Sequence, residues 1–294
     1  MNLLVLGGDG MLGHQLLHEW QERHRVAATF HRPLAAYDGV LDLTRVRAFG
    51  GVEARDVAAF EAIVREVRPD AVINGIGIVK QRAEAKAAIP SIEINALLPH
   101  RLAEVCQEHG ARFVHISTDC VFSGRAGNYR ETDVPDPVDL YGRSKLLGEV
   151  GYAPGLTLRT SIIGLELSRC TGLVEWFLAA CGTIRGFRRA IYSGFTTHAM
   201  AALIEHVLTS RPDLSGLWHV ASAPITKYNL LTQLAAALGR TDVDIVPDDD
   251  FACDRSLSAD AFAREVGYPA PAWRDMIAGL ADEIRARDRR RAGA

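Results

Sequence analysis

Short apolar runs alternate with amphipathic segments along roughly the first 160 residues of the chain. Five of the runs have the length of strands that are buried on both faces: residues 3–6, 26–30, 71–74, 112–117 and 156–159. Apolar residues at helical spacing follow between them, as at residues 56–67 and about 91–109. This alternation predicts an α/β fold, a doubly wound parallel sheet covered by helices on both faces.

The pattern changes after residue 160. A segment rich in aromatic residues and arginines spans about 165–190, and a helix is expected at 197–208. A late apolar run at 217–221 predicts a strand that returns to the sheet, and residues 224–284 predict a small helical lobe. We therefore expect a main domain at 1–164 with a return at about 195–222. Residues 165–194 and 223–294 would form a smaller C-terminal α/β lobe that binds the substrate.

A glycine-spaced turn follows the first apolar run. Gly7, Gly10 and Gly13 stand at three-residue intervals, and a helical pattern that includes Met11 and Leu12 begins within them. A strand, a glycine-rich turn and a helix form the context of a Rossmann-type dinucleotide loop, because backbone N–H groups at the helix start can hold a pyrophosphate. The spacing G-x-x-G-x-x-G departs from the commoner fingerprint. We predict that these five residues bind the cofactor.

The second apolar run is followed by Arg32 rather than by an acidic residue. An acid at this place binds the ribose hydroxyl of NAD, whereas an arginine accommodates the 2′-phosphate of NADP. The sequence therefore favours NADP and leaves NAD open. A third short strand is expected at Leu41–Leu43, with Asp42 at its end facing the adenine.

Composition narrows the class of protein. The chain of 294 residues is 48% hydrophobic and has a net charge of −3. This charge does not indicate a protein that binds nucleic acid, which usually carries an excess of basic residues. No apolar run reaches transmembrane length, no signal peptide is recognised, and five scattered cysteines without a C-x-x-C pair indicate a reducing cytoplasm. His14 and His18 have metal-ligand spacing but no evident third ligand, so no metal site is expected.

Tyr141 and Lys145 are four residues apart, so on a helix they share a face at roughly 5–6 Å between Cβ atoms. A cation on that face favours the phenolate and moves the pKa of a tyrosine toward the working range. The residues Asn74–Gly77 and Ser117–Asp119 follow two other predicted strands. Because parallel strands end at one edge of a sheet, Asn74 and Gly75 should approach the cofactor, and a hydroxyl of Thr118 or Ser117 should share a substrate oxygen with Tyr141.

Three longer stretches resemble one family: Gly7–His14, Ser117–Gly124 with Gly127–Asp133, and Tyr141–Glu149. They are similar to the dTDP-4-dehydrorhamnose reductase branch of the extended short-chain dehydrogenases/reductases, over about residues 1–164. The resemblance implies that Tyr141 is the general acid, that Lys145 tunes its pKa and holds the cofactor ribose, and that Thr118 orients the carbonyl. Asp119 and Val121 would contact the substrate, and the resemblance also implies a homodimer.

The C-terminal half matches the branch only loosely, and Cys120 stands where the branch usually has an aromatic residue. The sequence around Arg255 partly resembles the segment with which this family binds the nucleotide sugar. We therefore predict that Arg255 binds the diphosphate. Trp176 is a further substrate-binding candidate. Weaker ones are Arg185, Arg188, Arg189 and Thr196.

Three functions follow from this reading. The first is NAD(P)H-dependent reduction of a nucleotide-linked 4-keto-6-deoxy sugar, with the nucleotide-diphosphate sugar as partner. The second is a nucleotide-sugar epimerase or dehydratase that recycles a bound NAD, which the lack of an acid after the second strand counts against. The third is a non-catalytic regulatory subunit that binds a dinucleotide and a partner protein. The base, the sugar and the stereochemistry of the product stay open at this point.

Overall fold

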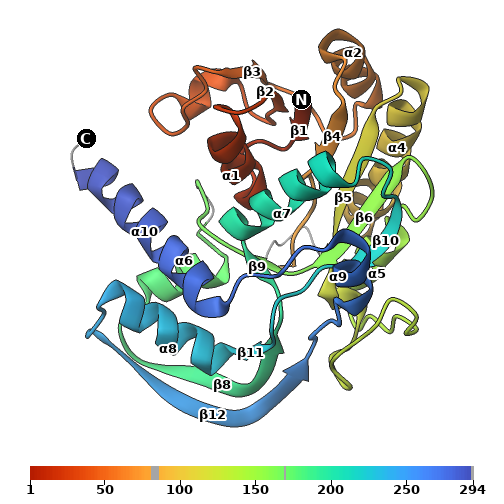
Figure 1. Cartoon of the computed structure of the whole chain (residues 1–294). Coiled ribbons are helices and arrows are strands. Elements are labelled where there is room, and N and C mark those ends of the chain that lie inside the picture. Colours follow the sequence, from red (N-terminus) through yellow and green to blue (C-terminus); the bar gives the residue numbers. More distant parts are fainter. Residues whose placement is uncertain (81–85, 169, 293–294) are drawn as a thin grey trace.

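The computed structural model describes residues 1–80, 86–168 and 170–292, and its centre is a sheet of seven parallel strands (Figure 1). The strand order is β10-β6-β5-β4-β1-β2-β3. The strands are β1 (Asn2–Leu6), β2 (Arg25–Thr29), β3 (Val46–Phe49), β4 (Ala71–Asn74), β5 (Arg112–Thr118), β6 (Gly155–Thr160) and β10 (Gly216–His219). The prediction of a doubly wound parallel sheet is confirmed, and so is the late strand that returns to its edge.

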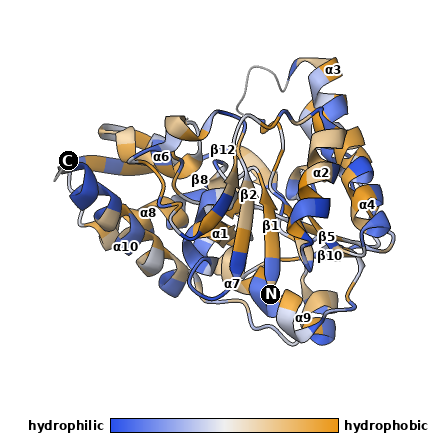
Figure 2. Ribbon diagram, turned by 90° about the horizontal axis from the view of Figure 1, so that it is seen from above, coloured by the Kyte–Doolittle hydropathy of each residue, from blue (hydrophilic) through white to orange (hydrophobic). Residues whose placement is uncertain are grey.

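Helices cover both faces of this sheet (Figures 1 and 2). Leu3 and Val5 of β1 point to the core beneath α1 (Met11–Trp20) and α7 (Thr197–Ser210), whereas Leu4 and Leu6 point to the core beneath α2 (Val57–Val67) and α4 (Leu98–Glu108). Successive side chains of a strand face opposite ways, so an uninterrupted apolar run is what a doubly covered strand requires.

The helices expected from the sequence are present with small changes. Asp56 caps α2 by accepting from the Ala59 N–H at 3.0 Å, as its position predicted. The helix expected near 91–109 consists of α3 (Ala88–Ser91), the π-helical turn η3 (Ile92–Leu97) and α4. Short 3₁₀ turns occupy η1 (Leu34–Tyr37) and η4 (Asp119–Val121).

The third strand was predicted wrongly. Residues Leu41–Leu43 form no strand, and the third strand is β3, which pairs with β2 from Val46 onward. Asp42 accepts hydrogen bonds from the Thr44 N–H at 3.0 Å and the Thr44 hydroxyl at 2.7 Å. Asp42 is therefore an exposed turn residue that precedes β3, rather than the end of a strand as predicted.

The segments assigned to the substrate lobe contain a second sheet with the order β11-β8-β12. Its strands are β8 (Gly182–Tyr192), β11 (Ile225–Thr226) and β12 (Val243–Asp254). The prediction that residues 224–284 are helical is thus wrong for β12. The C-terminal half also contains the helices α6 (Leu173–Ala179), α8 (Lys227–Leu238), α9 (Asp260–Val266) and α10 (Trp273–Ala292). A short strand pair is formed by β7 (Ile162–Ile163) and β9 (Phe195–Thr196). Positions 81–85, 169 and 293–294 of the predicted domains lie outside the described residues.

A cluster of ionisable side chains joins three helices on one side of the sheet. Glu19 of α1 accepts from His198 Nδ1 of α7 at 2.8 Å, and Gln15 Nε2 of α1 bridges Glu19 (3.0 Å) and Glu283 of α10 (3.2 Å). The pKa of Glu283 is raised to about 7, mainly by burial; His198 opposes this shift and the Glu19 carboxylate adds to it. The helices therefore pack best when Glu283 carries a proton.

We predict that Glu283→Gln stabilises the protein at pH 8 and has little effect at pH 5. The folded-state pKa of about 7 lies above the ordinary value of 4.5, so the folded state holds this proton more tightly and stability falls as pH rises between the two values. Glutamine mimics the protonated acid, and the gain at pH 8 should be on the order of 2 kcal/mol. Thermal unfolding at the two pH values checks this, and an equal shift at both would contradict it.

Candidate active site

The glycine turn after β1 packs tightly against the start of α1. A Cβ atom added to Gly13 would lie 2.0 Å from the carbonyl oxygen of Gly7, so any larger residue would push the helix away from the strand. Gly7 itself has a φ of +80°, which favours glycine. The turn thus has the tight backbone approach that was predicted for a dinucleotide loop.

The first turn of α1 is open to an anion. Gly10 is its N-cap and provides no side-chain cap, so the N–H groups of Met11 and Leu12 at the helix start meet no capping oxygen. A helix start of this kind combines free N–H donors with a partial positive charge. The geometry of the turn fits the pyrophosphate of a dinucleotide.

The segment after β2 is tied to the glycine turn. The Tyr37 hydroxyl donates to Asp9 Oδ2 at 2.9 Å and accepts from the Arg32 N–H at 3.4 Å. Among the described residues, the exposed guanidinium of Arg32 has no ion-pair partner. Arg32 therefore follows β2 beside the turn, where the sequence placed it for the 2′-phosphate of NADP.

The end of β4 adjoins the same turn. Gly75 N–H donates to the Leu6 carbonyl at 3.0 Å, and a Cβ added to Gly7 would lie 3.4 Å from the carbonyl carbon of Gly75. Asn74 is buried, and its Oδ1 accepts from the Ile76 N–H at 3.0 Å. Asn74 and Gly75 thus lie next to the predicted cofactor loop.

Tyr141 and Lys145 lie on α5 (Leu140–Leu147), on the face turned to β5. Asp139 caps this helix by accepting from the Gly142 N–H at 2.8 Å. A Cβ on Gly142 would lie 2.3 Å from the carbonyl oxygen of Cys120, so this glycine lets the helix approach the turn that follows β5. The predicted pair is therefore placed against the end of the predicted catalytic strand.

Burial raises the pKa of Tyr141 above its ordinary value, and the neighbouring Thr118 hydroxyl acts in the opposite direction. Lys145 Nζ donates to the Ile116 carbonyl at 2.7 Å and lies 3.2 Å from His115 Nε2. The expectation that Lys145 brings the pKa of Tyr141 down is therefore not met in this structure, because burial of the phenol is the largest effect on that pKa.

Ser117, the second candidate for the carbonyl-orienting hydroxyl, faces away from Tyr141. Its Oγ donates to Glu149 Oε1 at 2.6 Å, and Arg159 holds the same carboxylate through two bonds of 2.7 Å. Both members of this ion pair are about 5% exposed. Neighbouring residues of a strand face opposite ways, so Thr118 is the hydroxyl that meets Tyr141.

Asp119 and Arg255 come together although they are far apart in the sequence. The Arg255 charge lowers the pKa of Asp119, but burial has the larger effect and raises it. Arg255 Nε also donates to the Phe122 carbonyl at 2.8 Å. The chain near Arg255 is bonded to the loop after β5, since Tyr129 N–H donates to the Ser256 carbonyl at 2.9 Å. The C-terminal lobe thus places a cation near the end of β5.

The other two predicted substrate residues differ in their positions. Val121, at the end of η4, is fully buried in a small apolar cluster with Phe122 and Tyr129. Trp176 is 45% exposed on α6, and no described contact joins it to Tyr141 or Thr118. The weaker candidates are engaged elsewhere: Arg185 with Asp248 and Asp250, Arg188 with Asp249, and Thr196 as the N-cap of α7.

Three buried residues that the sequence analysis did not assign also organise the site. His115 bridges Asn74 and Lys145, and Glu149 holds Ser117. Asn95, in the π-helical turn, accepts from the Ile78 N–H at 2.8 Å and donates to Ser144 Oγ at 3.2 Å, so it joins the loop after β4 to α5. A π-helical turn around a buried polar residue is a frequent sign of a functional region.

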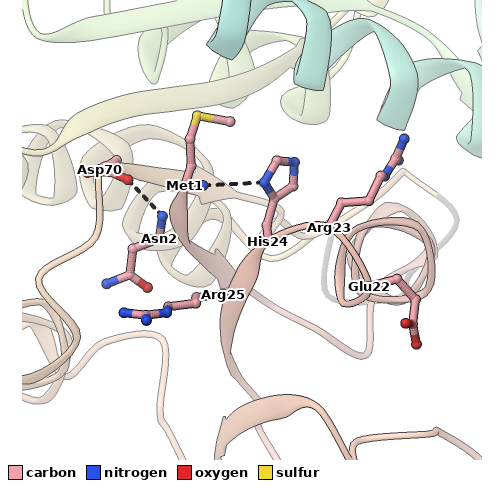
Figure 3. A pocket seen from close by; sticks show the side chains of 7 residues that line it. All are labelled: Met1, Asn2, Glu22, Arg23, His24, Arg25 and Asp70. Carbon is pink, nitrogen blue, oxygen red and sulfur yellow. Dashed lines mark hydrogen bonds between the residues drawn. The ribbon is translucent and has the colours of Figure 1, made fainter.

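One hollow lies away from the candidate site. It surrounds the first residue of β1, at the amino edge of the sheet, where the Met1 amine lies 3.4 Å from His24 Nδ1 and the Asn2 N–H donates to Asp70 at 2.7 Å (Figure 3). Charges of both signs line it. The candidate site is at the opposite, carboxyl edge. Within residues 1–80, 86–168 and 170–292, every helix is too short or too polar to cross a membrane.

The seven-stranded sheet with the glycine turn after β1 is a Rossmann-type fold of the kind found in NAD(P)-dependent oxidoreductases of the extended short-chain class. The family model described as "RmlD substrate binding domain" matches residues 1–161. The chain belongs to this family.

Three known proteins illustrate the similarity. A dTDP-4-dehydrorhamnose reductase of Burkholderia thailandensis is 28% identical over 96% of this chain and 91% of that protein. Methionine adenosyltransferase 2 subunit beta of Xenopus laevis is 28% identical over 84% of this chain and 75% of that protein. The dTDP-4-dehydrorhamnose reductase of Bacillus anthracis, solved in complex with NADP, has a TM-score of 0.76 at 21% identity, over 96% of this chain and 98% of that one.

We predict that Gly13→Ala weakens NADPH binding by about tenfold or more, since a Cβ so close to the Gly7 carbonyl must displace the turn from its pyrophosphate-binding shape. The fluorescence of bound NADPH measures the affinity. Gly279→Ala is the matched control, because nothing lies within 4 Å of its Cβ position on α10. The control should keep the affinity and gain about 1 kcal/mol of stability. Equal affinities for all three proteins would remove the turn from the cofactor site.

Proposed function

We propose that the protein uses NADPH to reduce the 4-keto group of a nucleotide-diphosphate-linked 6-deoxy sugar. The observation that carries this proposal is the closeness of the Thr118 hydroxyl to the Tyr141 phenol at the end of β5, in a chain of the RmlD family. The similarity to dTDP-4-dehydrorhamnose reductases supports the sugar-nucleotide class of the substrate.

The mechanism follows from the charge that develops on the ketone oxygen when hydride reaches its carbon. Tyr141 and Thr118 are the donors for that oxygen, and donors placed there stabilise the transition state more than the ground state. A tyrosine with an ordinary pKa of about 10 is protonated at neutral pH, so the phenol of Tyr141 has a proton to give as the general acid. Thr118 fixes the direction of the carbonyl.

The cofactor supplies the hydride when it is bound. Gly7, Gly10 and Gly13 with the first N–H groups of α1 would hold its pyrophosphate, and Arg32 its 2′-phosphate. Lys145 would hold the cofactor ribose, and its ammonium form, which a pKa of about 8 leaves populated at neutral pH, would stabilise the tyrosinate left after proton transfer. The protein thereby positions two reactants, and the reduction itself belongs to the cofactor.

Asp119 and Arg255 are the proposed contacts for the sugar nucleotide. Arg255 is a partly buried cation next to the catalytic strand, and a guanidinium can bind a diphosphate through two parallel hydrogen bonds. Asp119 adjoins Thr118, so its carboxyl group can accept from a sugar hydroxyl. The same two residues would orient the sugar ring over the phenol.

A second function is favoured by one observation, the similarity to the beta subunits of methionine adenosyltransferase 2. In that case the chain would bind a dinucleotide and a partner protein without turnover. The complete Thr118–Tyr141–Lys145 set favours the enzyme, because a regulatory subunit has no need of it. An epimerase or dehydratase with a resident NAD is the third option, and purification with stoichiometric NAD would favour it.

We predict that Tyr141→Phe lowers kcat for NADPH-dependent reduction by about 100-fold or more, since the general acid is lost while the ring keeps its packing. NADPH consumption against a panel of nucleotide-linked 4-keto-6-deoxy sugars measures this. Tyr152→Phe is the matched control: Tyr152 lies close to α4, where its hydroxyl is 2.9 Å from His100 Nδ1, and its loss should leave kcat unchanged.

The outcomes of this assay separate the three functions. Turnover by the wild type that Tyr141→Phe abolishes supports the reductase. Equal rates in the two proteins would take Tyr141 out of the chemistry. If no sugar of the panel is reduced and the protein copurifies with a partner, the regulatory subunit is the better description.

We predict that Arg32→Asp raises the KM for NADPH by about tenfold or more and changes the KM for NADH much less, because only NADPH carries the phosphate that the guanidinium would bind. Steady-state kinetics with both cofactors checks this. Arg65→Asp, at an exposed position of α2, controls for the change in net charge. An equal effect of Arg32→Asp on both cofactors would overturn the NADP assignment.

A further inference from the structure

The buried imidazole of His115 lies between Asn74, beside the proposed cofactor loop, and Lys145. His115 of β5 is 0% exposed. Its Nδ1 lies 3.1 Å from Asn74 Nδ2, and its Nε2 lies 3.2 Å from Lys145 Nζ. Asn74 immediately precedes Gly75, which adjoins the glycine turn. One chain of polar contacts therefore runs from the cofactor loop to the catalytic helix.

The contacts of Asn74 determine which nitrogen of His115 carries the proton. Asn74 Oδ1 is occupied by the Ile76 N–H at 3.0 Å, so the amide must present its NH₂ group to the imidazole. An NH₂ group only donates, and Nδ1 must therefore accept. Burial holds the pKa of His115 well below its ordinary value, with a further contribution from Lys145, so the ring is neutral. A neutral imidazole that accepts at Nδ1 carries its proton on Nε2.

That proton faces Lys145. An ammonium group has donors only, whereas a neutral amine can accept from Nε2–H and still donate to the Ile116 carbonyl at 2.7 Å. The other charged groups around the lysine are Glu149, just beyond the end of α5, and, further away, His100 of α4, which acts on the imidazole. Burial lowers the pKa of Lys145 to about 8, and Glu149 opposes this shift.

We propose that His115 is a positioning residue for Lys145, and that the tautomer which Asn74 imposes on its imidazole decides whether the lysine is held as an amine or as an ammonium. The inference rests on the proposed function, which assigns Lys145 to the reaction. It adds that Asn74, which lies beside the cofactor loop, acts through His115 on the charge state of the lysine. A change in the hydrogen bonding of Asn74 then changes the protonation state of Lys145, although the two side chains are joined only through His115.

The tautomer can be observed directly in the wild-type protein. Long-range proton–nitrogen NMR spectra of the nitrogen-15-labelled protein at pH 9 distinguish a protonated ring nitrogen from a bare one. We expect the His115 signals to show a bare Nδ1 and a protonated Nε2. A proton on Nδ1 would overturn the proposal, and this experiment depends on no variant.

The effect on the lysine is measured by titrating the Cε signal of Lys145 in protein with carbon-13-labelled lysine, assigned by its absence in Lys145→Arg. In His115→Gln the side-chain carbonyl can accept from the ammonium, so the pKa of Lys145 should rise by about one unit. The alkaline limb of the pH profile of kcat/KM should move in the same direction. His109→Gln, at a surface histidine that lies 3.6 Å from Glu61, should leave the titration unchanged. An unchanged Lys145 pKa in folded His115→Gln would contradict the proposal.

Asn74→Asp provides a second route, because its carboxylate would accept from Nδ1–H and turn Nε2 into an acceptor for Lys145. The lysine pKa should rise, and the rise should be larger with His115 present than in the His115→Gln background, where only the added charge acts. Equal shifts in the two backgrounds would exclude the tautomer. Since the titrations use no sugar, shifts of the expected size together with no turnover would refute the proposed function and leave the role of His115 intact.

Discussion

The parallel direction of β1, β4 and β5 is the constraint on which the site depends. Because the three strands run the same way, the turns after Leu6, Asn74 and Thr118 emerge at one edge of the sheet. Hydrogen bonds then join these turns in sequence: Gly75 bonds to Leu6, and Asn74 meets His115 of the neighbouring strand. The glycine turn and α5 need not touch, since the strand ends between them fix their relative position.

Much of this arrangement could be predicted from the sequence, because it follows from local signals. Continuous apolar runs marked the strands covered on both sides, and the glycine spacing marked the turn. The strands β3, β8 and β12 could not be recognised that way. β3 lies at the edge of the sheet and carries the exposed Arg47, whereas β12 contains three consecutive aspartates, which disfavour strands. Arginines of the neighbouring strand β8 offset those charges, and that pairing joins residues about 60 positions apart.

The site residues also divide into those that local sequence signals predict and those that they do not. Thr118, Tyr141 and Lys145 were predictable as strand-end and helix positions, and Arg255 was reached only by resemblance. The protonation states were not predictable, because they depend on burial. Helical spacing suggested that Lys145 lowers the pKa of Tyr141, yet burial raises the pKa of the phenol and lowers that of the lysine. The lysine, with a pKa of about 8, is left close to the pH at which a neighbouring group can change its charge.

The most direct test of the account is a crystal structure of the protein with NADP⁺ and a nucleoside-diphosphate sugar. The account predicts the pyrophosphate at the start of α1, the nicotinamide between the glycine turn and α5, and the sugar diphosphate at Arg255. The C4 oxygen of the sugar should lie within hydrogen-bonding distance of both Tyr141 and Thr118. A nicotinamide directed away from Tyr141, or a nucleotide sugar bound at another surface, would contradict it.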